Sequence, residues 1–267
     1  MLVHGWKQSH RLFDRAALHL TELGHRVISY DSRGMGESDK PDGKYEFKTL
    51  ASDLGEVLTA TGVKSATLVG WSMGCSVSLE FLTSYANDHV EKLVLHNGPL
   101  KLTHADDFSH AMTLAQFSDY LRAAVQSWPR SERDFQRESL LPEADESLVD
   151  FLWYVAMQTP LDIAIKLARQ QSQLDHRQVL KELQIPVRAL YSRNDPYYPV
   201  SLAHWIALQA TDGSVVELFN SAHGAALEEP ETFAAEISNF SQPDGAVHAT
   251  KVSHAEADVA GGLDRSF

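Results

Sequence analysis

Short apolar runs alternate with longer amphipathic segments along most of the chain. Runs rich in β-branched and apolar residues predict strands at positions 1–4, 24–31, 65–70, 90–99, 185–192 and 214–220. Segments with apolar residues near helical spacing predict helices at positions 11–23, 49–62, 74–86, 201–210 and 230–240. Because strands that alternate with helices favour a mostly parallel sheet with helices on both faces, we expect an α/β fold.

The strand rhythm stops between residues 101 and 184. This stretch predicts helices only, at positions 114–128, 146–159 and 160–174. We therefore expect an α/β core formed by residues 1–100 and 185–240, with a helical cap inserted at 101–184. Residues 241–267 are small and polar, with a single aromatic at the very end, and predict a disordered tail.

Composition narrows the class of protein. The chain has 267 residues, of which 43% are hydrophobic, enough for one sizeable core. Its net charge of −13 and the absence of a Lys/Arg-rich run argue against nucleic acid or an anionic membrane surface as a partner. The one cysteine, Cys75, excludes an intramolecular disulfide and is expected to pack in the core.

Targeting and cofactor signals are weak throughout. The start "MLVHGW" is too short for a signal peptide, and no apolar run approaches the roughly 18 residues of a membrane span. We expect a cytoplasmic protein that acts on a small molecule, and a homo-oligomer is compatible with the sequence. No Cys/His spacing fits zinc and no phosphate-binding glycine loop is present, so neither a metal nor a cofactor is expected.

A serine stands between two glycines in "LVGWSMGCSVSLEF" (68–81). A predicted strand ends directly before it, and a predicted helix begins directly after it. Gly70 and Gly74 permit a sharp strand-to-helix turn that exposes the Ser72 hydroxyl at the head of the helix. This context is typical of a nucleophile elbow and makes Ser72 the candidate nucleophile.

A serine hydroxyl needs a base, and the base needs an orienting acid. His223 follows the last predicted strand, and Asp195 follows the strand before it. Because the carboxyl ends of parallel strands share one edge of the sheet, both are expected near Ser72. Attack on an ester also creates an oxyanion, for which the backbone N–H groups of Met73 and Trp6 are the candidate donors.

Several motifs together resemble the α/β-hydrolase superfamily: "LVHGW", "YDSRGMGESDKP", "LVGWSMGCS", "SRNDPYYPV" and "NSAHGAALEEP". The resemblance covers residues 2–240 and is greatest for cofactor-free haloperoxidases and aryl esterases. It implies an α/β-hydrolase fold with Ser72 as nucleophile, Asp195 as acid and His223 as base. It also implies Trp6 and Met73 as the oxyanion donors.

The sequence departs from that family in two respects. The family normally has two further strands before "HGW", whereas this sequence starts inside the third, which predicts an exposed sheet edge. The cap does not match the subgroup closely, so the resemblance says little about the substrate. Ser72 at the elbow excludes the dehalogenases and epoxide hydrolases, which carry an aspartate there.

These residues predict a serine hydrolase that forms an acyl-enzyme on a small carboxylic ester or related acyl substrate. The same triad is compatible with perhydrolysis, in which hydrogen peroxide replaces water, and with lactone, thioester or C–C bond hydrolysis. A non-catalytic ligand binder of this fold and a non-functional remnant are the competing classes. Apolar residues of the cap and elbow are the candidate pocket lining, with packing as an equally good reading: Trp71, Trp128, Phe151, Trp153, Tyr154 and Met157.

Overall fold

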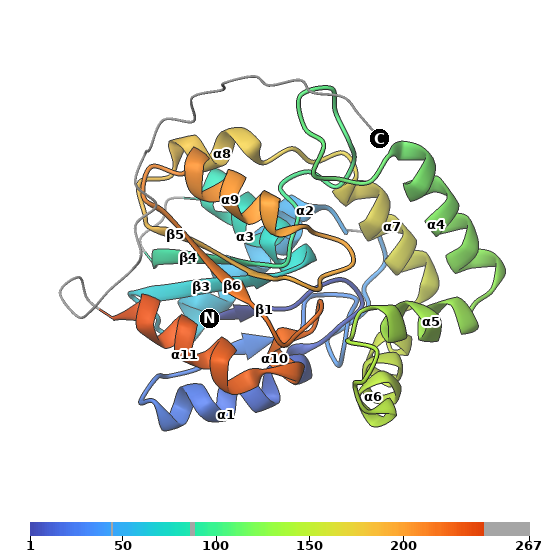
Figure 1. Cartoon of the computed structure of the whole chain (residues 1–267), viewed down its shortest axis with the longest axis horizontal. Helices are drawn as coiled ribbons and strands as arrows, with labels where there is room; N and C mark the ends of the chain where they lie inside the picture. The colour runs from blue at the N-terminus through green and yellow to red at the C-terminus, as the bar shows by residue number, and fades with distance from the viewer. Residues whose placement is uncertain (44, 86–88, 243–267) are drawn as a thin grey trace, which may run out of the picture.

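The computed structural model describes residues 1–43, 45–85 and 89–242. Its centre is a six-stranded sheet in the order β2-β1-β3-β4-β5-β6, and every neighbouring pair is parallel (Figure 1). The strands are β1 (Leu2–Val3), β2 (Ser29–Tyr30), β3 (Ala66–Trp71), β4 (Val90–His96), β5 (Val187–Ser192) and β6 (Gly213–Leu218). The predicted α/β fold with a parallel sheet is confirmed.

Strand β2 is much shorter than the run at 24–31 that predicted it. Its only partner among the described residues is β1, which pairs through Leu2 and Val3 alone. A strand extends only as far as its partner offers backbone groups, so β2 is limited to Ser29 and Tyr30.

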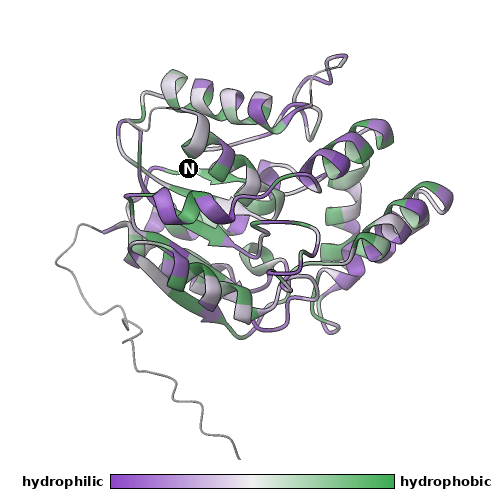
Figure 2. Ribbon diagram, turned by 90° about the horizontal axis from the view of Figure 1, so that it is seen from above, coloured by the Kyte–Doolittle hydropathy of each residue, from purple (hydrophilic) through white to green (hydrophobic). Residues whose placement is uncertain are grey.

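Helices cover both faces of the sheet because consecutive strand residues point to opposite sides. One face packs on η1 (His10–Phe13), α1 (Asp14–Glu22), α10 (Ala225–Glu228) and α11 (Pro230–Ser241). The other face packs on α2 (Phe47–Ala60), α3 (Met73–Ser84) and α9 (Val200–Gln209). Neighbouring residues of β3 accordingly point to opposite faces. Val69 packs on the face covered by α1, α10 and α11, and Leu68 packs on the face covered by α2, α3 and α9. Figure 2 shows the hydrophobic strands enclosed between helices whose outer faces are more hydrophilic.

Five helices lie between β4 and β5 in the chain: α4 (Leu114–Gln126), α5 (Arg130–Glu138), α6 (Glu146–Met157), α7 (Leu161–Gln171) and α8 (Arg177–Glu182). The apolar pattern predicts α4, α6 and α7, and misses α5 and α8. Helix α5 escapes because the face it buries carries Glu132 and Gln136 in place of apolar residues. The division into a core and a cap at residues 101–184 stays a prediction.

In the described part of the chain, no single helix is long and apolar enough to cross a membrane. Helices α6 and α7 reach that length and hydropathy only together, and their axes differ by 92°. Of the tail predicted at 241–267, Ser241 ends α11, and residues 243–267 lie outside the described residues.

Candidate active site

Ser72 stands at the junction of β3 and α3 with φ 55° and ψ −121°, a backbone conformation that non-glycine residues rarely adopt. The Ser72 N–H donates to the carbonyl of His96 at the end of β4 (3.0 Å). A Cβ on Gly70 would lie 2.6 Å from the carbonyl oxygen of Gly74, so the turn closes only with glycine there. Such strain, held by its surroundings, is typical of a functional turn.

The loop after β1 lies directly against this turn. A Cβ on Gly5 would come within 2.9 Å of the Ser72 Cβ, so the loop and the serine touch. Among the described residues, the backbone N–H groups of Trp6 and Met73 have no protein acceptor. Two unpaired donors beside a serine hydroxyl suit a developing oxyanion.

The His4 side chain holds that loop through two hydrogen bonds to backbone groups. Its Nδ1 donates to the carbonyl of Gly5 (2.8 Å), and its Nε2 accepts from the Ser32 N–H (3.0 Å). Burial lowers the pKa of His4, so the ring is neutral and both nitrogens are occupied. The arrangement suits a residue that orders the loop and leaves no nitrogen free to act as a base.

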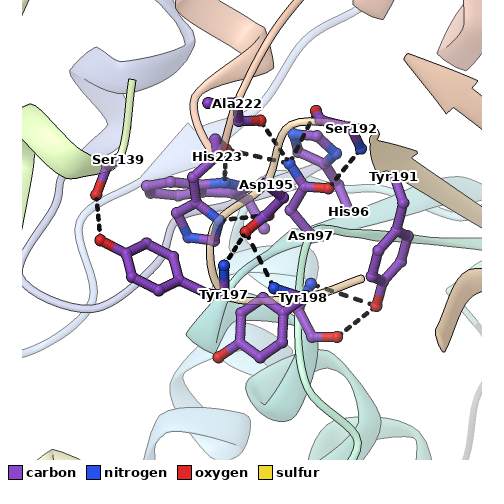
Figure 3. Close-up of polar contacts among 12 residues, drawn as sticks. His96, Asn97, Ser139, Tyr191, Ser192, Asp195, Tyr197, Tyr198, Ala222 and His223 are labelled. Carbon is purple, nitrogen blue, oxygen red and sulfur yellow. Dashed lines mark hydrogen bonds and ion pairs between the residues drawn. The ribbon is translucent and has the colours of Figure 1, made fainter. Parts of the chain in front are cut away.

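Asp195 and His223 meet at the same end of the sheet, on the loops after β5 and β6 (Figure 3). The His223 Nδ1 lies 2.8 Å from the Asp195 Oδ2, and the two side chains are 5% and 0% exposed. The other carboxylate oxygen, Oδ1, accepts the backbone N–H groups of Tyr197 (2.7 Å) and Tyr198 (3.1 Å). Because the carboxylate faces Nδ1, that nitrogen carries the proton and Nε2 is left as the acceptor.

Backbone contacts hold the His223 loop in place. The indole N–H of Trp71 donates to the His223 carbonyl (2.8 Å), and the His223 N–H donates to the carbonyl of Ser139 (3.0 Å). The Asn97 side-chain amide donates to the carbonyl of Ala222 (3.1 Å) and accepts from the Ser192 N–H (2.8 Å). Asn97 has a positive φ of 42°. No sequence motif marked Asn97 for this positioning role.

A cavity of about 100 Å³ opens over Ser72 and His223, both of which line it. Its wall is largely aromatic, as ring contacts run from Trp6 to Tyr120 (5.7 Å), then Phe135 (5.5 Å) and Tyr197 (5.3 Å). The Tyr197 ring meets the His223 ring edge-on at 5.0 Å. A largely apolar cavity with a few polar groups is typical of a small-molecule site.

Of the predicted pocket residues, Trp71 lines this cavity, whereas Trp128, Phe151, Trp153, Tyr154 and Met157 do not. These five therefore form no part of this cavity wall, and a role for any of the six in substrate binding stays a prediction. Helix α6 buries Val149, Leu152, Val155 and Ala156 against its neighbours, which turns Tyr154 outward to 68% exposure. Besides Trp6 and Trp71, the aromatic residues that line the cavity come from α4, α5 and the loop after Asp195. Two of them, Tyr197 and Tyr198, stand in the motif "NDPYYPV".

Comparison with known proteins identifies the family. The sequence pattern of the alpha/beta hydrolase fold matches residues 1–230. A relative from Bacillus subtilis (strain 168), "AB hydrolase superfamily protein YisY", is 25% identical over 90% of each chain. A "Non-heme chloroperoxidase" from Streptomyces lividans is 23% identical over 89% of each chain. The solved esterase EaEST from Exiguobacterium antarcticum has a TM-score of 0.85 at 25% identity, over 90% of each chain.

The chain belongs to the α/β-hydrolase fold family. The resemblance to haloperoxidases and esterases that the motifs carried is confirmed by these relatives.

Proposed function

We propose that the protein is a serine hydrolase that cleaves a small carboxylic ester or related acyl substrate through an acyl-enzyme. The observation that carries the proposal is the strained turn at Ser72. Ser72 lines the same cavity as His223, and His223 is hydrogen-bonded to Asp195. The esterase EaEST, which has a similar fold, supports the same class of reaction.

In this proposal each group has one role. The Ser72 Oγ attacks the carbonyl carbon while the His223 Nε2 accepts its proton, and Asp195 stabilises the resulting imidazolium. The Trp6 and Met73 N–H groups hold the oxyanion. The tetrahedral intermediate collapses, the alcohol leaves with the proton from Nε2, and Ser72 keeps the acyl group. Water then repeats the sequence, which releases the acid and restores the Ser72 hydroxyl.

Labelling with a fluorophosphonate, read by intact mass, tests this proposal. We expect one adduct on the unchanged chain and none on Ser72→Ala or His223→Ala, since only an activated hydroxyl attacks phosphorus. For p-nitrophenyl acetate, Ser72→Ala is expected to lose at least about 10⁴-fold in kcat/KM. Ser147→Ala, which changes an exposed serine, is the control. An adduct on folded Ser72→Ala, or undiminished hydrolysis by it, would contradict the proposal.

Perhydrolysis is a second candidate, favoured by the relative named a non-heme chloroperoxidase. Here hydrogen peroxide attacks the acyl-enzyme in place of water and releases a peracid. Incubation with an acetate ester and hydrogen peroxide should then yield peracetic acid, and Ser72→Ala should not form it. Ester cleavage without any peracid would leave hydrolysis as the reaction.

A further inference from the structure

Four buried polar side chains form a hydrogen-bonded chain between helix α5 and the loop after β1, beside the candidate cavity. The Lys7 ammonium contacts Glu132 Oε2, and Glu132 Oε1 accepts from the Gln136 Nε2 at 2.7 Å. The Gln136 Oε1 in turn accepts from the Gln8 Nε2 at 3.2 Å. All four side chains are buried, and Gln8 and Gln136 line the cavity.

The charges at one end fix the direction of both amides. The Glu132 carboxylate beside Lys7 only accepts hydrogen bonds, so Gln136 turns its NH₂ group toward Glu132 and its oxygen toward Gln8. Gln8 must then present its NH₂ group to Gln136. The same NH₂ group donates to the carbonyl of Leu152 (3.3 Å), which also only accepts. Reversing the Gln8 amide would lose both contacts.

This orientation leaves one group unused. The Gln8 Oε1 is buried and has no partner among the described residues. A buried amide oxygen without a donor is costly, and such atoms in native structures call for an explanation. Gln8 follows Trp6, the candidate oxyanion donor, by two positions, and it lines the same cavity as Ser72.

We propose that the Gln8 Oε1 accepts a hydrogen bond from the substrate, and that the substrate is an ester carrying a hydroxyl or N–H donor beside its reacting carbonyl group. This inference rests on the proposed function. Lys7, Glu132 and Gln136 act as positioning residues, because they hold the Gln8 NH₂ group toward Gln136 and leave the Gln8 oxygen without a protein partner among the described residues. The cavity thus combines an aromatic wall, which accepts apolar groups, with one directed acceptor.

Other polar groups at the cavity do not offer the same directed acceptor. The Gln171 Nε2 donates to Ser76 (3.1 Å), and the Ser139 hydroxyl donates to the carbonyl of Phe135 (2.8 Å). The Tyr197 hydroxyl also contacts Ser139 (3.1 Å). Hydroxyl groups rotate and present either a donor or an acceptor, whereas the Gln8 amide is fixed by two acceptors.

Binding to the Ser72→Ala chain tests the inference without catalysis. Calorimetric titration compares methyl esters with a hydroxyl on carbon 2, 3 or 4 of the acyl chain against their methoxy counterparts, and hydroxyalkyl butyrates against methoxyalkyl butyrates. A methoxy group accepts but does not donate. At one position or more, we expect the hydroxyl ligand to bind about tenfold more tightly, as one buried hydrogen bond provides.

Adding Gln8→Met should reduce that preference to within about twofold, because methionine keeps the length and removes the acceptor. Gln8→Asn, which keeps an amide and withdraws it by one methylene, should do the same and serves if Gln8→Met does not fold. The control is Gln178→Met, on an exposed glutamine of α8, where the tenfold preference should persist.

The outcomes separate the two proposals. If no hydroxyl position is preferred, or if the preference survives in folded Gln8 variants, the inference about Gln8 is wrong even when the unchanged chain hydrolyses simple esters. If the preference is found and depends on Gln8, while no ester is cleaved by the unchanged chain, the hydrolase proposal fails and the ligand site stands.

Discussion

Two buried pairs of side chains, the hydrogen-bonded His223 and Asp195 and the ion pair of Lys7 and Glu132, differ in what they leave free. His223 and Asp195 are 5% and 0% exposed, and Lys7 and Glu132 are 1% and 1% exposed. In the first pair, the Asp195 Oδ2 contacts the imidazole at Nδ1 and leaves its Nε2 available. In the second pair, Glu132 is shared between Lys7 and Gln136, and the Lys7 ammonium also lies 3.6 Å from the centre of the Trp6 ring.

Burial alone therefore does not mark a reactive group, since both pairs are almost completely buried. The first pair is built on loops at the carboxyl ends of two strands, where side chains gather at an open edge. The second pair joins the loop after β1 to helix α5 and closes the space between them. In the proposed reaction the first pair moves a proton, whereas the second pair holds two segments together.

Replacing Asp195 by Asn tests the first pair. Because Oδ1 receives two backbone N–H groups, the asparagine oxygen must stay there and its NH₂ group must face His223. His223 would then have to accept at Nδ1 and protonate Nε2, the tautomer that cannot take the serine proton. We expect kcat for p-nitrophenyl acetate to fall about 10³- to 10⁴-fold, with KM changed little. A loss under tenfold in the folded variant would contradict this assignment.

Breaking the second pair should mainly change stability. Glu132→Gln leaves the buried Lys7 without its counter-charge, and we expect the free energy of unfolding in urea to fall by about 3–5 kcal/mol. Lys7→Met with Glu132→Met should cost less than the sum of the two single changes, since neither charge is then left alone. Lys166→Met, at an exposed ion pair with Asp162, should cause no measurable change. Additive costs at Lys7 and Glu132 would show that the pair is not coupled.

His96, at the end of β4, is a further buried titratable group, and its effect is expected on stability. Burial lowers its pKa to about 4, and its Nδ1 donates to the carbonyl of Leu190 (2.8 Å). The unfolded chain binds this proton below about pH 6.5 and the folded chain does not, so stability is present above pH 6.5 and is lost as the pH falls toward 4. By pH 5 the loss is about 2 kcal/mol. His96→Gln should lack this part of the loss when urea unfolding is compared at pH 7 and pH 5; an unchanged slope would contradict it.

The smallest effect is expected at the cap surface. Tyr154→Ala removes a side chain that is 68% exposed and outside the cavity, so the chain-length preference for p-nitrophenyl esters should shift less than about twofold. Phe135→Ala, which removes a ring from the cavity wall, should shift it more. Each variant removes an aromatic ring from a helix, α6 for Tyr154 and α5 for Phe135, so the two form a matched pair. A larger shift in Tyr154→Ala than in Phe135→Ala would contradict this expectation and favour the substrate pocket predicted from the sequence, which includes Tyr154.

The sequence alone determined the parallel sheet and the positions of its strands along the chain. The apolar runs predict the strands because a parallel strand is buried on both faces, and the glycines around Ser72 predict the sharp turn because only small residues permit it. Asp195 and His223 could be nominated for the same reason, since strand ends in a parallel sheet meet at one edge. Their roles in catalysis stay proposals.

Only the tertiary structure decided the cavity wall and the polar chain behind it. Helix α5 has no apolar periodicity because its inward positions face Lys7 and Gln8, residues more than a hundred positions away in sequence. Likewise, nothing local distinguishes the exposed Tyr154 from the cavity residue Phe135. Periodicity records how much of a helix is buried, whereas the partner it is buried against is set by long-range packing, and that partner determines what a ligand meets.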